Sequence, residues 1–373
     1  MNFDFTDTQE MVRDTLQRFL KDRYDFESRQ KISRSDAGWS EEIWKSFAEE
    51  LGILGASFSE ELGGLGGGQI ENMIVMEEVG RSLVVEPYLS TVVIGGGFAR
   101  EYGKSDVIEG IVGGETRIAF AWAEPKGRYN LDHVETTARE KDGGFVLSGH
   151  KAVVRDAPGA THLIVTARTS GGTSDSNGVS LFLIPKDTNG VSTRDYPLVD
   201  GGSASEVYFE NAEVSQDALL GELGKASGTV RKVVDEAVVG LCAEGVGVME
   251  AMNRLTQDYT KERKQFGVPI SKFQVLQHRM VDMFMEAEQG RSMTYMAVNR
   301  LPDSASVAQA KAKIGKGLTY VGQNAVQLHG GIGITDEYAV GHYFKRATMI
   351  ESEFGSTDHY LRRYERLALD EAA

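Results

Sequence analysis

The chain has 373 residues, of which 41% are apolar, and 40 Lys and Arg against 55 Asp and Glu give it a net charge of −15. A chain of this length can bury a large core and form two or three domains. The negative charge argues against nucleic acid as a partner, because neutralising phosphates requires a basic face. A phosphorylated small ligand is still compatible, since it needs only a local basic pocket.

The cysteine count and the hydropathy pattern exclude further classes. The single cysteine, Cys242, rules out an internal disulfide framework or a cysteine zinc cluster, and its apolar helical surroundings indicate a packing role. The histidines lack metal-ligand spacing, so no metal site is expected. No apolar stretch reaches about 18 residues, and the N-terminus lacks the apolar segment of a signal peptide. We therefore expect a cytoplasmic protein without a membrane span.

The first zone of the chain has helical periodicity. From Asp7 to about Gly113, apolar residues such as Met11, Leu16 and Leu20 recur at helical spacing, which predicts an N-terminal helical domain over residues 1–114. A glycine cluster at 59–68 fails the G-x-G-x-x-G spacing and no strand precedes it. It therefore indicates a turn between helices, not a dinucleotide loop.

The middle zone alternates with a period of two and carries turn signals, which is typical of strands. It predicts an antiparallel sheet or barrel domain over residues 115–220. The candidate strands cover residues 116–124, 134–140, 144–154, 161–168, 178–185 and 205–211.

Helical periodicity returns in the last zone, residues 221–373. Four long segments joined by short loops predict an antiparallel four-helix bundle. The segments cover residues 226–261, 271–300, 304–329 and 336–368. Within the last segment, Ser356, Thr357 and Asp358 follow Gly355 as candidate caps, which suggests one helix ending and another starting there. The predicted fold class is therefore α+β, with the β domain between two helical domains.

Two stretches of the last zone could bind a ligand. In KERKQFGVPISKFQ, Arg263 ends a helix, where it could either complement the helix dipole or form a charge-assisted fork to a phosphate. In VQLHGGIGITDEY, Gly330 and Gly331 follow a helix, where they could be C-caps or could let a ligand approach the backbone, with Gln327 supplying an amide. Spacing alone leaves both alternatives open.

These motifs together resemble the acyl-CoA dehydrogenase family. The resemblance rests on the domain order, the EELGGLG turn, ERKQFG followed by Gln274, and QLHGG-x-G followed by an acidic residue, and it covers essentially the whole chain. It implies FAD bound at a subunit interface, an acyl-CoA substrate and, as electron acceptor, an electron-transferring flavoprotein. The residues implied to hold the adenosine and pyrophosphate of an FAD are Arg263, Phe266, Gln274, Gln327, Leu328, His329, Gly330 and Gly331.

The family's reaction needs a carboxylate that removes the α-proton of the thioester while flavin N5 takes a hydride from the β-carbon. The family has two places for this base, and this sequence has no carboxylate at either. One place, normally Y-E-G-T-S, reads E-F-G-S-T and holds Phe354. The other, on the first long helix of the bundle, holds Ala237. The weak candidates for a displaced base are the adjacent Glu353 and Glu236.

The β domain departs from the family pattern as well. The loop that the family writes T-E-P-x-x-G-S-D reads AEPKGRYN at 123–130, without the hydroxyls that bond the flavin. In the strand normally written K-x-W-I-[ST]-N, the tryptophan is replaced by Val153 and the hydroxyl by Arg155. The sequence thus retains the adenosine half of an FAD site and has lost much of the flavin half.

Two hypotheses follow. The favoured one makes this chain a subunit of a heteromeric acyl-CoA dehydrogenase, a heterotetramer in fatty-acid or side-chain β-oxidation, whose base-containing sister chain uses an FAD site that this chain completes. The other is a homomeric dehydrogenase with Glu353 or Glu236 as a displaced base. A purely structural subunit and an acyl-CoA oxidase are further alternatives.

Overall fold

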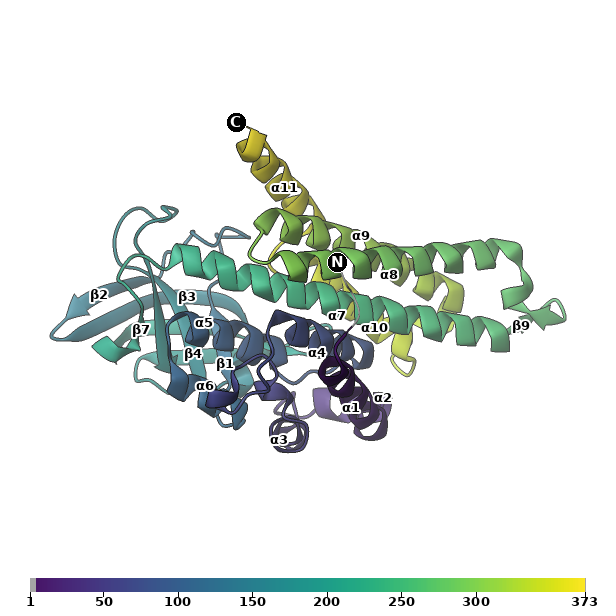
Figure 1. Cartoon of the computed structure of the whole chain (residues 1–373), viewed down its shortest axis with the longest axis horizontal. Helices are drawn as coiled ribbons and strands as arrows, with labels where there is room; N and C mark the ends of the chain where they lie inside the picture. Colours follow the sequence, from purple (N-terminus) through teal and green to yellow (C-terminus); the bar gives the residue numbers. More distant parts are fainter. Residues whose placement is uncertain (1–4, 373) are drawn as a thin grey trace. The chain divides into compact units, whose positions relative to one another are not determined.

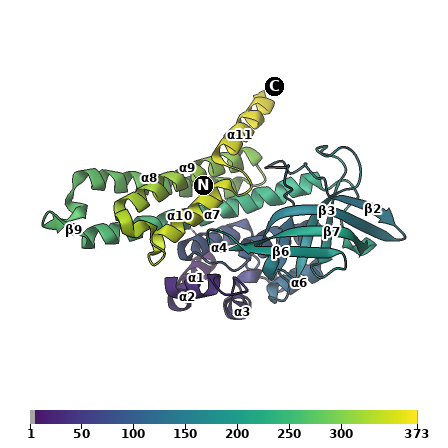
Figure 2. The same cartoon turned by 180° about the vertical axis from the view of Figure 1, so that it is seen from behind.

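The computed structural model describes residues 5–372, and the chain divides into two compact units. The first comprises Met1–Lys31, Gln69–Val84 and Val238–Ala373, and the second comprises Ile32–Gly68 and Val85–Ala237. Figures 1 and 2 show the helices and strands of the two units. The three predicted domains, divided at residues 114 and 220, are continuous stretches of sequence, whereas each of these units combines several stretches. The three-domain division stays a prediction.

The first unit is helical. Its helices are α1 (Asp7–Arg23), α2 (Phe26–Ser33, which ends just inside the second unit), α4 (Gln69–Ser82), the part of α7 (Ser227–Glu262) that follows residue 237, α8 (Gln274–Arg300), α9 (Ser304–His329), α10 (Ala339–Ser352) and α11 (Thr357–Ala372). Polar residues set the helix starts: Thr6 and Gln9 form a capping box at α1, and the Asp303 carboxylate caps α9.

Small residues bring the long helices of this unit close together. A side chain at Gly245 on α7 would lie 2.8 Å from Ile314 of α9, and one at Gly290 on α8 would lie 2.9 Å from the same isoleucine. Three long helices therefore run side by side, as Figure 1 shows for α7, α8 and α9. The predicted helical bundle is confirmed.

One helix prediction in the bundle is wrong. The segment 336–368 is two helices, α10 and α11, because the chain leaves helical geometry at Glu353, which is extended (φ −67°, ψ 128°). Phe354 then has φ +56° and Gly355 φ +137°, values that no right-handed helix accommodates. Only the capping residues proposed after the glycine, 356–358, agree with a new helix starting there.

The second unit holds the predicted β domain. Its eight-stranded sheet has the order β6-β7-β3-β2-β4-β5-β8, with β1 beside β4. The strands are β1 (Ile118–Ala121), β2 (Thr137–Lys141), β3 (Gly144–Arg155), β4 (His162–Arg168), β5 (Val179–Pro185), β6 (Val191–Pro197), β7 (Ser203–Ser215) and β8 (Leu219–Leu220).

Most neighbouring strands are antiparallel, which confirms the central antiparallel β domain. Two pairings depart from that rule, because β1 and β2 both run parallel to β4. The sequence did not predict β6 or β8. In β6 the side chains of 192–195 are exposed and polar, so no apolar alternation marks this strand.

The longer helices of the second unit and three short helical turns precede or follow the strands of this sheet along the chain. They are α3 (Glu41–Glu49), the short 3-10 turns η1 (Ile53–Gly55) and η2 (Glu60–Leu62), the π-helix η3 (Leu89–Gly95), α5 (Gly96–Glu101), α6 (Ser105–Val112) and the first turns of α7. Gly96 packs against the ring of Phe58 and Gly97 against Val233 on α7, at distances that leave no room for a side chain. The start of α5 is therefore held on two sides.

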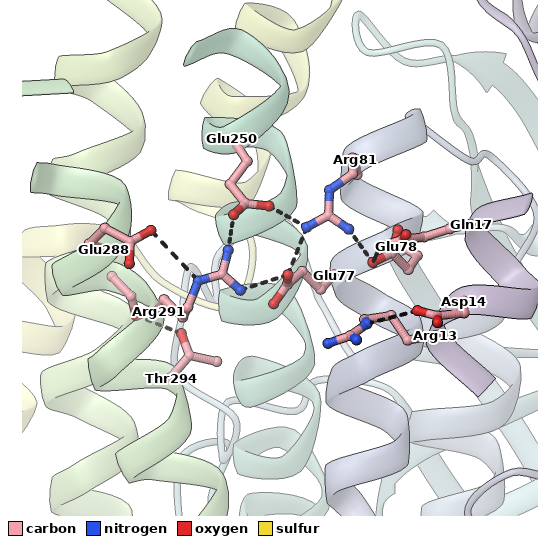
Figure 3. A network of polar contacts seen from close by, with 11 residues as sticks. Arg13, Asp14, Gln17, Glu77, Glu78, Arg81, Glu250, Glu288, Arg291 and Thr294 are labelled. Carbon is pink, nitrogen blue, oxygen red and sulfur yellow. Dashed lines mark hydrogen bonds and ion pairs between the residues drawn. The ribbon is translucent and has the colours of Figure 1, made fainter. Parts of the chain in front are cut away.

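Within the first unit, a network of charged side chains joins α4 to α7 and α8 (Figure 3). Arg81 contacts Glu77, Glu78 and Glu250, and Arg291 contacts Glu77 and Glu250. Burial alone would lower the pKa of Arg81. The neighbouring carboxylates of Glu78 and Glu250 have the larger combined effect and raise that pKa. Burial raises the pKa of Glu78 despite that arginine. The network stabilises the unit only while each buried charge keeps its partner.

This network gives the first prediction. Replacing Arg81 with Met should lower the free energy of unfolding by roughly 3 to 5 kcal/mol, because the Glu78 carboxylate, only 2% exposed, would lose its cation. Urea unfolding followed by circular dichroism measures this loss. The matched control is Arg13→Met, since Arg13 is 32% exposed and pairs at the surface with Asp14. It should cost less than about 1 kcal/mol, and equal losses in the two variants would contradict the assignment.

Candidate cofactor and active site

The first site is built where α7 ends. Arg263 follows the last residue of α7, and its backbone bonds both to Tyr259 (2.8 Å) and to Ile270 (2.8 Å). The chain then makes a small hairpin from β9 (Lys264–Gln265) and β10 (Val268–Pro269). Its two turn residues, Phe266 and Gly267, both have positive φ, as a type I′ turn requires.

A second segment meets this one. α9 ends at His329, and Gly330 follows with φ +63°, so the last turn of the helix opens into the 3-10 turn η7 (Gly330–Ile334). Gly330 and Gly331 are exposed, and a side chain built on either would meet nothing within 4 Å. Their backbone therefore borders open space that a ligand can approach.

The two segments together line one pocket of about 540 Å³. Six of the eight predicted cofactor residues border it: Arg263, Gln327, Leu328, His329, Gly330 and Gly331. The other two do not: Phe266 is 93% exposed at the hairpin tip, and Gln274 is the exposed first residue of α8. Sequence reasoning missed Tyr259, Gln265, Ile270 and Ile332, which complete the lining and show no motif of their own.

The back wall of the pocket is aromatic. The His329 ring stacks on Tyr259, with centroids 4.6 Å apart, and lies 5.1 Å from Tyr338. Its Nδ1 bonds the Ala325 carbonyl at 2.7 Å. Burial lowers the pKa of His329, so the ring is neutral near pH 7. The only cationic side chain of the pocket lining is thus Arg263, which suits a phosphate.

The family's first base position lies in the turn between α10 and α11. The buried Lys311 ammonium on α9 donates to the carbonyls of Ile350 (2.8 Å), Glu351 (2.9 Å) and Gly355 (2.8 Å). Tyr360 donates to the Phe354 carbonyl at 3.2 Å. These bonds hold the turn in place although Phe354 itself, left-handed and apolar, can neither accept nor donate a proton.

Glu353, one candidate for a displaced base, lies beside a cation. Its carboxylate is 3.4 Å from Arg346, which also forms two bonds, of 2.5 and 2.7 Å, to the buried Glu244 of α7. Glu353 is extended and not helical, so its side chain is not turned away from position 354 by the 100° that separates neighbouring residues of a helix. What opposes a base role is the ion pair with Arg346, which already engages the Glu353 carboxylate.

The second base position lies on α7 in the other unit. Ala237 is fully buried, and the adjacent Glu236 pairs with Arg100 of α5 at 2.6 Å. Burial raises the pKa of Glu236, while Arg100 acts against that shift. A raised pKa favours proton transfer near neutral pH, so Glu236 is the better of the two displaced candidates.

Strand β3, which the family resemblance places beside the flavin, carries an irregularity. β3 shifts register against β7 between Lys151 and Val154, and Val153 in this bulge has φ +51° and is 53% exposed. Two residues on, Arg155 lies 3.3 Å from the buried carboxylate of Asp200. The two substitutions relative to the family pattern, Val153 and Arg155, therefore lie in or next to a β-bulge of this strand.

A buried ion pair fixes the start of loop 123–130 to this strand. Lys151 donates to Glu124 at 2.7 Å and to Thr166 at 2.9 Å, with both charged side chains at most 1% exposed. Burial lowers the pKa of Lys151 to about 8, although the negative charge of Glu124 acts to raise it. Glu124 also lies near His133 and Glu135 in a group of possible metal ligands. Its carboxylate is already bonded to Lys151, which disfavours a cation there.

Three comparisons bear on this site. Family models for the N-terminal, middle and C-terminal domains of acyl-CoA dehydrogenase match residues 6–109, 119–212 and 229–366. The chain is 29% identical to the "Probable acyl-CoA dehydrogenase YngJ" of Bacillus subtilis (strain 168), over 96% of this chain and 97% of that protein.

Among the helices of residues 5–372, none is long and apolar enough to cross a membrane.

Solved structures agree with these matches. An FAD complex of PigA has a TM-score of 0.90 at 25% identity and covers 99% of each chain. A Tcur3481–Tcur3483 steroid ACAD has a TM-score of 0.88 at 27% identity and covers 98% of this chain and 99% of that one. The pocket with its single arginine and its open glycine backbone suits a nucleotide pyrophosphate of the kind that FAD contains.

The turn between α10 and α11 gives a testable pH dependence. Burial lowers the pKa of Lys311 to about 8, against 10.5 for a free lysine. Between these values the unfolded chain binds the proton and the folded chain does not, so the stability contributed by this group rises with pH across that window. The advantage of the wild type over Lys311→Met in urea unfolding should therefore grow from pH 8 to pH 10.5.

Lys313→Met is the matched control, two residues along α9, where the partly buried lysine has a carboxylate partner, Glu286, at 2.7 Å. Its stability difference from the wild type should stay nearly constant over the same pH range. A flat difference for Lys311→Met as well would show that Lys311 stays charged in the folded protein.

Proposed function

Since the chain belongs to the acyl-CoA dehydrogenase family, we propose that it is the base-lacking subunit of a heteromeric, FAD-dependent acyl-CoA dehydrogenase. One observation carries this proposal. The pocket of Arg263 and Gly330 is complete, whereas both positions of the family's base hold apolar side chains, Phe354 and Ala237. A sister chain would supply the base, and this chain would complete the FAD site that the sister uses.

In the proposed role, Arg263 binds the FAD pyrophosphate by charge-assisted hydrogen bonds. Gln327 supplies an amide, and the backbone at Gly330 and Gly331 lies against the ligand because no side chain intervenes. Phe266 and Gln274, which lie outside the pocket lining, would contact the remainder of the cofactor. All of these side chains are exposed, so a second chain is needed to exclude water from the bound dinucleotide.

This chain's own β domain suits a flavin ring poorly. The positions that the family fills with a tryptophan and a hydroxyl hold Val153 and Arg155, and Arg155 is engaged by Asp200 at 3.3 Å. The Arg155 guanidinium is held by the buried Asp200 carboxylate, so it cannot take over the hydrogen bond that a hydroxyl at this position donates to the flavin. The assembled enzyme should therefore hold fewer flavins than subunits.

When FAD is bound, it accepts the hydride from the β-carbon of the thioester, and a carboxylate takes the α-proton. That carboxylate must be kept from water to be basic enough, and the thioester carbonyl must receive hydrogen bonds. Neither Phe354 nor Ala237 can perform the proton transfer. The contribution of this chain is then to bind and orient the cofactor and to shield the site.

The substrate class follows from the family and from similar structures. An acyl-CoA thioester is proposed as substrate, and the similar structures include both a steroid ACAD and a butyryl-CoA dehydrogenase, so both ring-bearing and simple acyl chains are substrates to test. Such a reaction belongs to β-oxidation of a fatty acid or side chain in the cytoplasm. Its electrons would pass to an electron-transferring flavoprotein, as the family resemblance implies.

A second candidate function is a homomeric dehydrogenase with a displaced base. The buried Glu236 with its raised pKa is the observation that favours it. Its ion pair with Arg100 and that of Glu353 with Arg346 count against it, because each carboxylate already has a cationic partner. A purely structural subunit would lack a working FAD pocket altogether.

Arg263→Ala tests the cofactor assignment. It removes a charge-assisted contact worth roughly 1.5–3 kcal/mol, so the FAD affinity of the purified assembly should fall by about one to two orders of magnitude. Flavin absorbance per protein measures the occupancy. Lys264→Ala, at the next exposed residue but outside the pocket lining, is the control and should keep its flavin. Equal occupancy in both variants would remove Arg263 from the site.

The missing base makes a separate prediction. Purified without its sister chain, this chain should hold little FAD and dehydrogenate neither butyryl-CoA nor a steroid side-chain thioester. Co-expressed with the product of an adjacent, similar, base-containing reading frame, it should form a mixed tetramer with fewer flavins than subunits and with activity. Light scattering, flavin content and dye reduction report these properties.

A homomeric preparation with one flavin per chain would instead support the second candidate function. Turnover by that preparation, abolished by Glu236→Gln or by Glu353→Gln, would identify the displaced base and overturn the proposal.

A further inference from the structure

One loop contributes to both the lining and the back wall of the cofactor pocket. It covers residues 332–338, from the second half of η7 to the start of α10. Ile332 lines the pocket, and Tyr338 packs on the His329 ring, with centroids 5.1 Å apart. Between these two ends, residues 334–337 are exposed. Packing therefore does not hold the middle of the loop, and its position depends on polar contacts.

Two side chains from outside the loop hold its middle at Asp336. Gln30 of α2 donates its amide to the Asp336 carbonyl at 2.7 Å. The Nε2 atom of His342, on α10, lies 3.0 Å from the same carbonyl and 3.2 Å from the Asp336 carboxylate. His342 is only 7% exposed, so its ring has a fixed place. The loop is thus tied to both α2 and α10.

The other ring nitrogen of His342 decides its protonation state. Arg29 of α2 is 2% exposed, is bonded to the Leu83 carbonyl at 3.3 Å, and places Nη1 3.2 Å from His342 Nδ1. A guanidinium can only donate hydrogen bonds, so Nδ1 is the acceptor. The proton of the neutral ring is therefore on Nε2, which donates it to the Asp336 carbonyl. An imidazolium would turn an N–H toward the guanidinium, and that bond would be lost.

We propose that His342 is a positioning residue of the cofactor pocket and that it acts only as a neutral imidazole. With Arg29 on one nitrogen and Asp336 on the other, it connects α2 to the loop 332–338. Protonation breaks the bond to Arg29 and releases the loop. The step from loop to cofactor rests on the proposed function, because it takes the pocket to hold FAD. The control of the loop by His342 does not.

The charges around the ring favour its neutral form. Burial lowers the pKa of His342, and the positive charges of Arg29 and Lys345 lower it as well. Asp336 acts in the opposite direction, but its carboxylate is 54% exposed, and water weakens its charge. A released ring takes up a proton near the ordinary pKa of 6.5, whereas the held ring does not. The held loop is therefore less stable as the pH falls below that value.

Hydrogen exchange of the full chain without cofactor tests the control of the loop. In the wild type, protection of peptides covering residues 332–338, corrected for the intrinsic exchange rate, should fall by up to about tenfold from pH 7.5 to pH 5.5, one pH unit below the ordinary histidine value. In His342→Gln, which gains no proton in this range, the protection should be the same at both pH values.

His162→Gln is the matched control, because burial also lowers the pKa of His162, on β4 of the other unit. This variant should keep the pH dependence of the wild-type loop. A wild-type loop whose protection does not change with pH would overturn the proposal, and so would a fall of the same size in His342→Gln.

Arg29→Gln guards against a His342 variant that fails to fold. Without the guanidinium, the protonated ring can stay in place and the loop remains held, so protection should again be independent of pH. A fall of wild-type size in this variant would show that the guanidinium does not exclude the proton, and the proposal would be wrong.

Flavin retention by the assembled enzyme tests the positioning role. The FAD released on gel filtration, measured by its fluorescence, should increase from pH 7.5 to pH 5.5 for the wild type and stay constant for His342→Gln. A loop that is released at low pH without any loss of FAD would overturn the positioning role. The Arg263→Ala variant shows independently whether the pocket binds FAD, so the two failures are distinguishable.

Discussion

The constraint on which the candidate sites depend is a left-handed backbone at non-glycine residues. Phe354 at the base position, Val153 beside the expected flavin and Phe266 at the hairpin tip all have φ between +51° and +56°. Each such residue costs on the order of 1–3 kcal/mol and persists only where its surroundings hold it. Three carbonyl bonds from Lys311 do this for the turn at Phe354. The turn at Phe354 thus keeps a strained backbone under a side chain that can neither accept nor donate a proton.

Periodicity predicted most of the fold, whereas the residues of the Arg263 pocket were implied by the family resemblance, because spacing alone left their role open. The long helical runs and the strand alternation depend on burial, which a single sequence shows directly, and Arg263 and Gly330 lie at helix ends that the pattern marks. The extended and left-handed backbone at 353–355 was not predicted, because the apolar residues on both sides of it continue a single helical period. Strand β6 was missed because its exposed middle residues show no apolar alternation and its place depends on pairing with β7.

Partners of charged groups could not be predicted at all. The pairs of Glu353 with Arg346, of Glu236 with Arg100 and of Arg155 with Asp200 join residues that are distant in sequence or lie around a turn. They matter for function, because each candidate carboxylate already has a cationic partner that a base role would have to accommodate. A sequence lists the carboxylates near a base position, but only the fold shows which of them are already neutralised.

If this chain is the base-lacking subunit proposed above, it would still need a rigid scaffold. The Arg263 pocket lies at the ends of α7 and α9, and both helices are fixed by close glycine contacts. α9 is also held by Lys311, whose carbonyl partners lie in the turn at Phe354. Loosening that turn would therefore remove a support of the helix that carries Gln327 and Gly330 to the pocket. Under the proposed function, the need to support the cofactor pocket would therefore be enough to preserve the backbone geometry at Phe354, whatever side chain stands there.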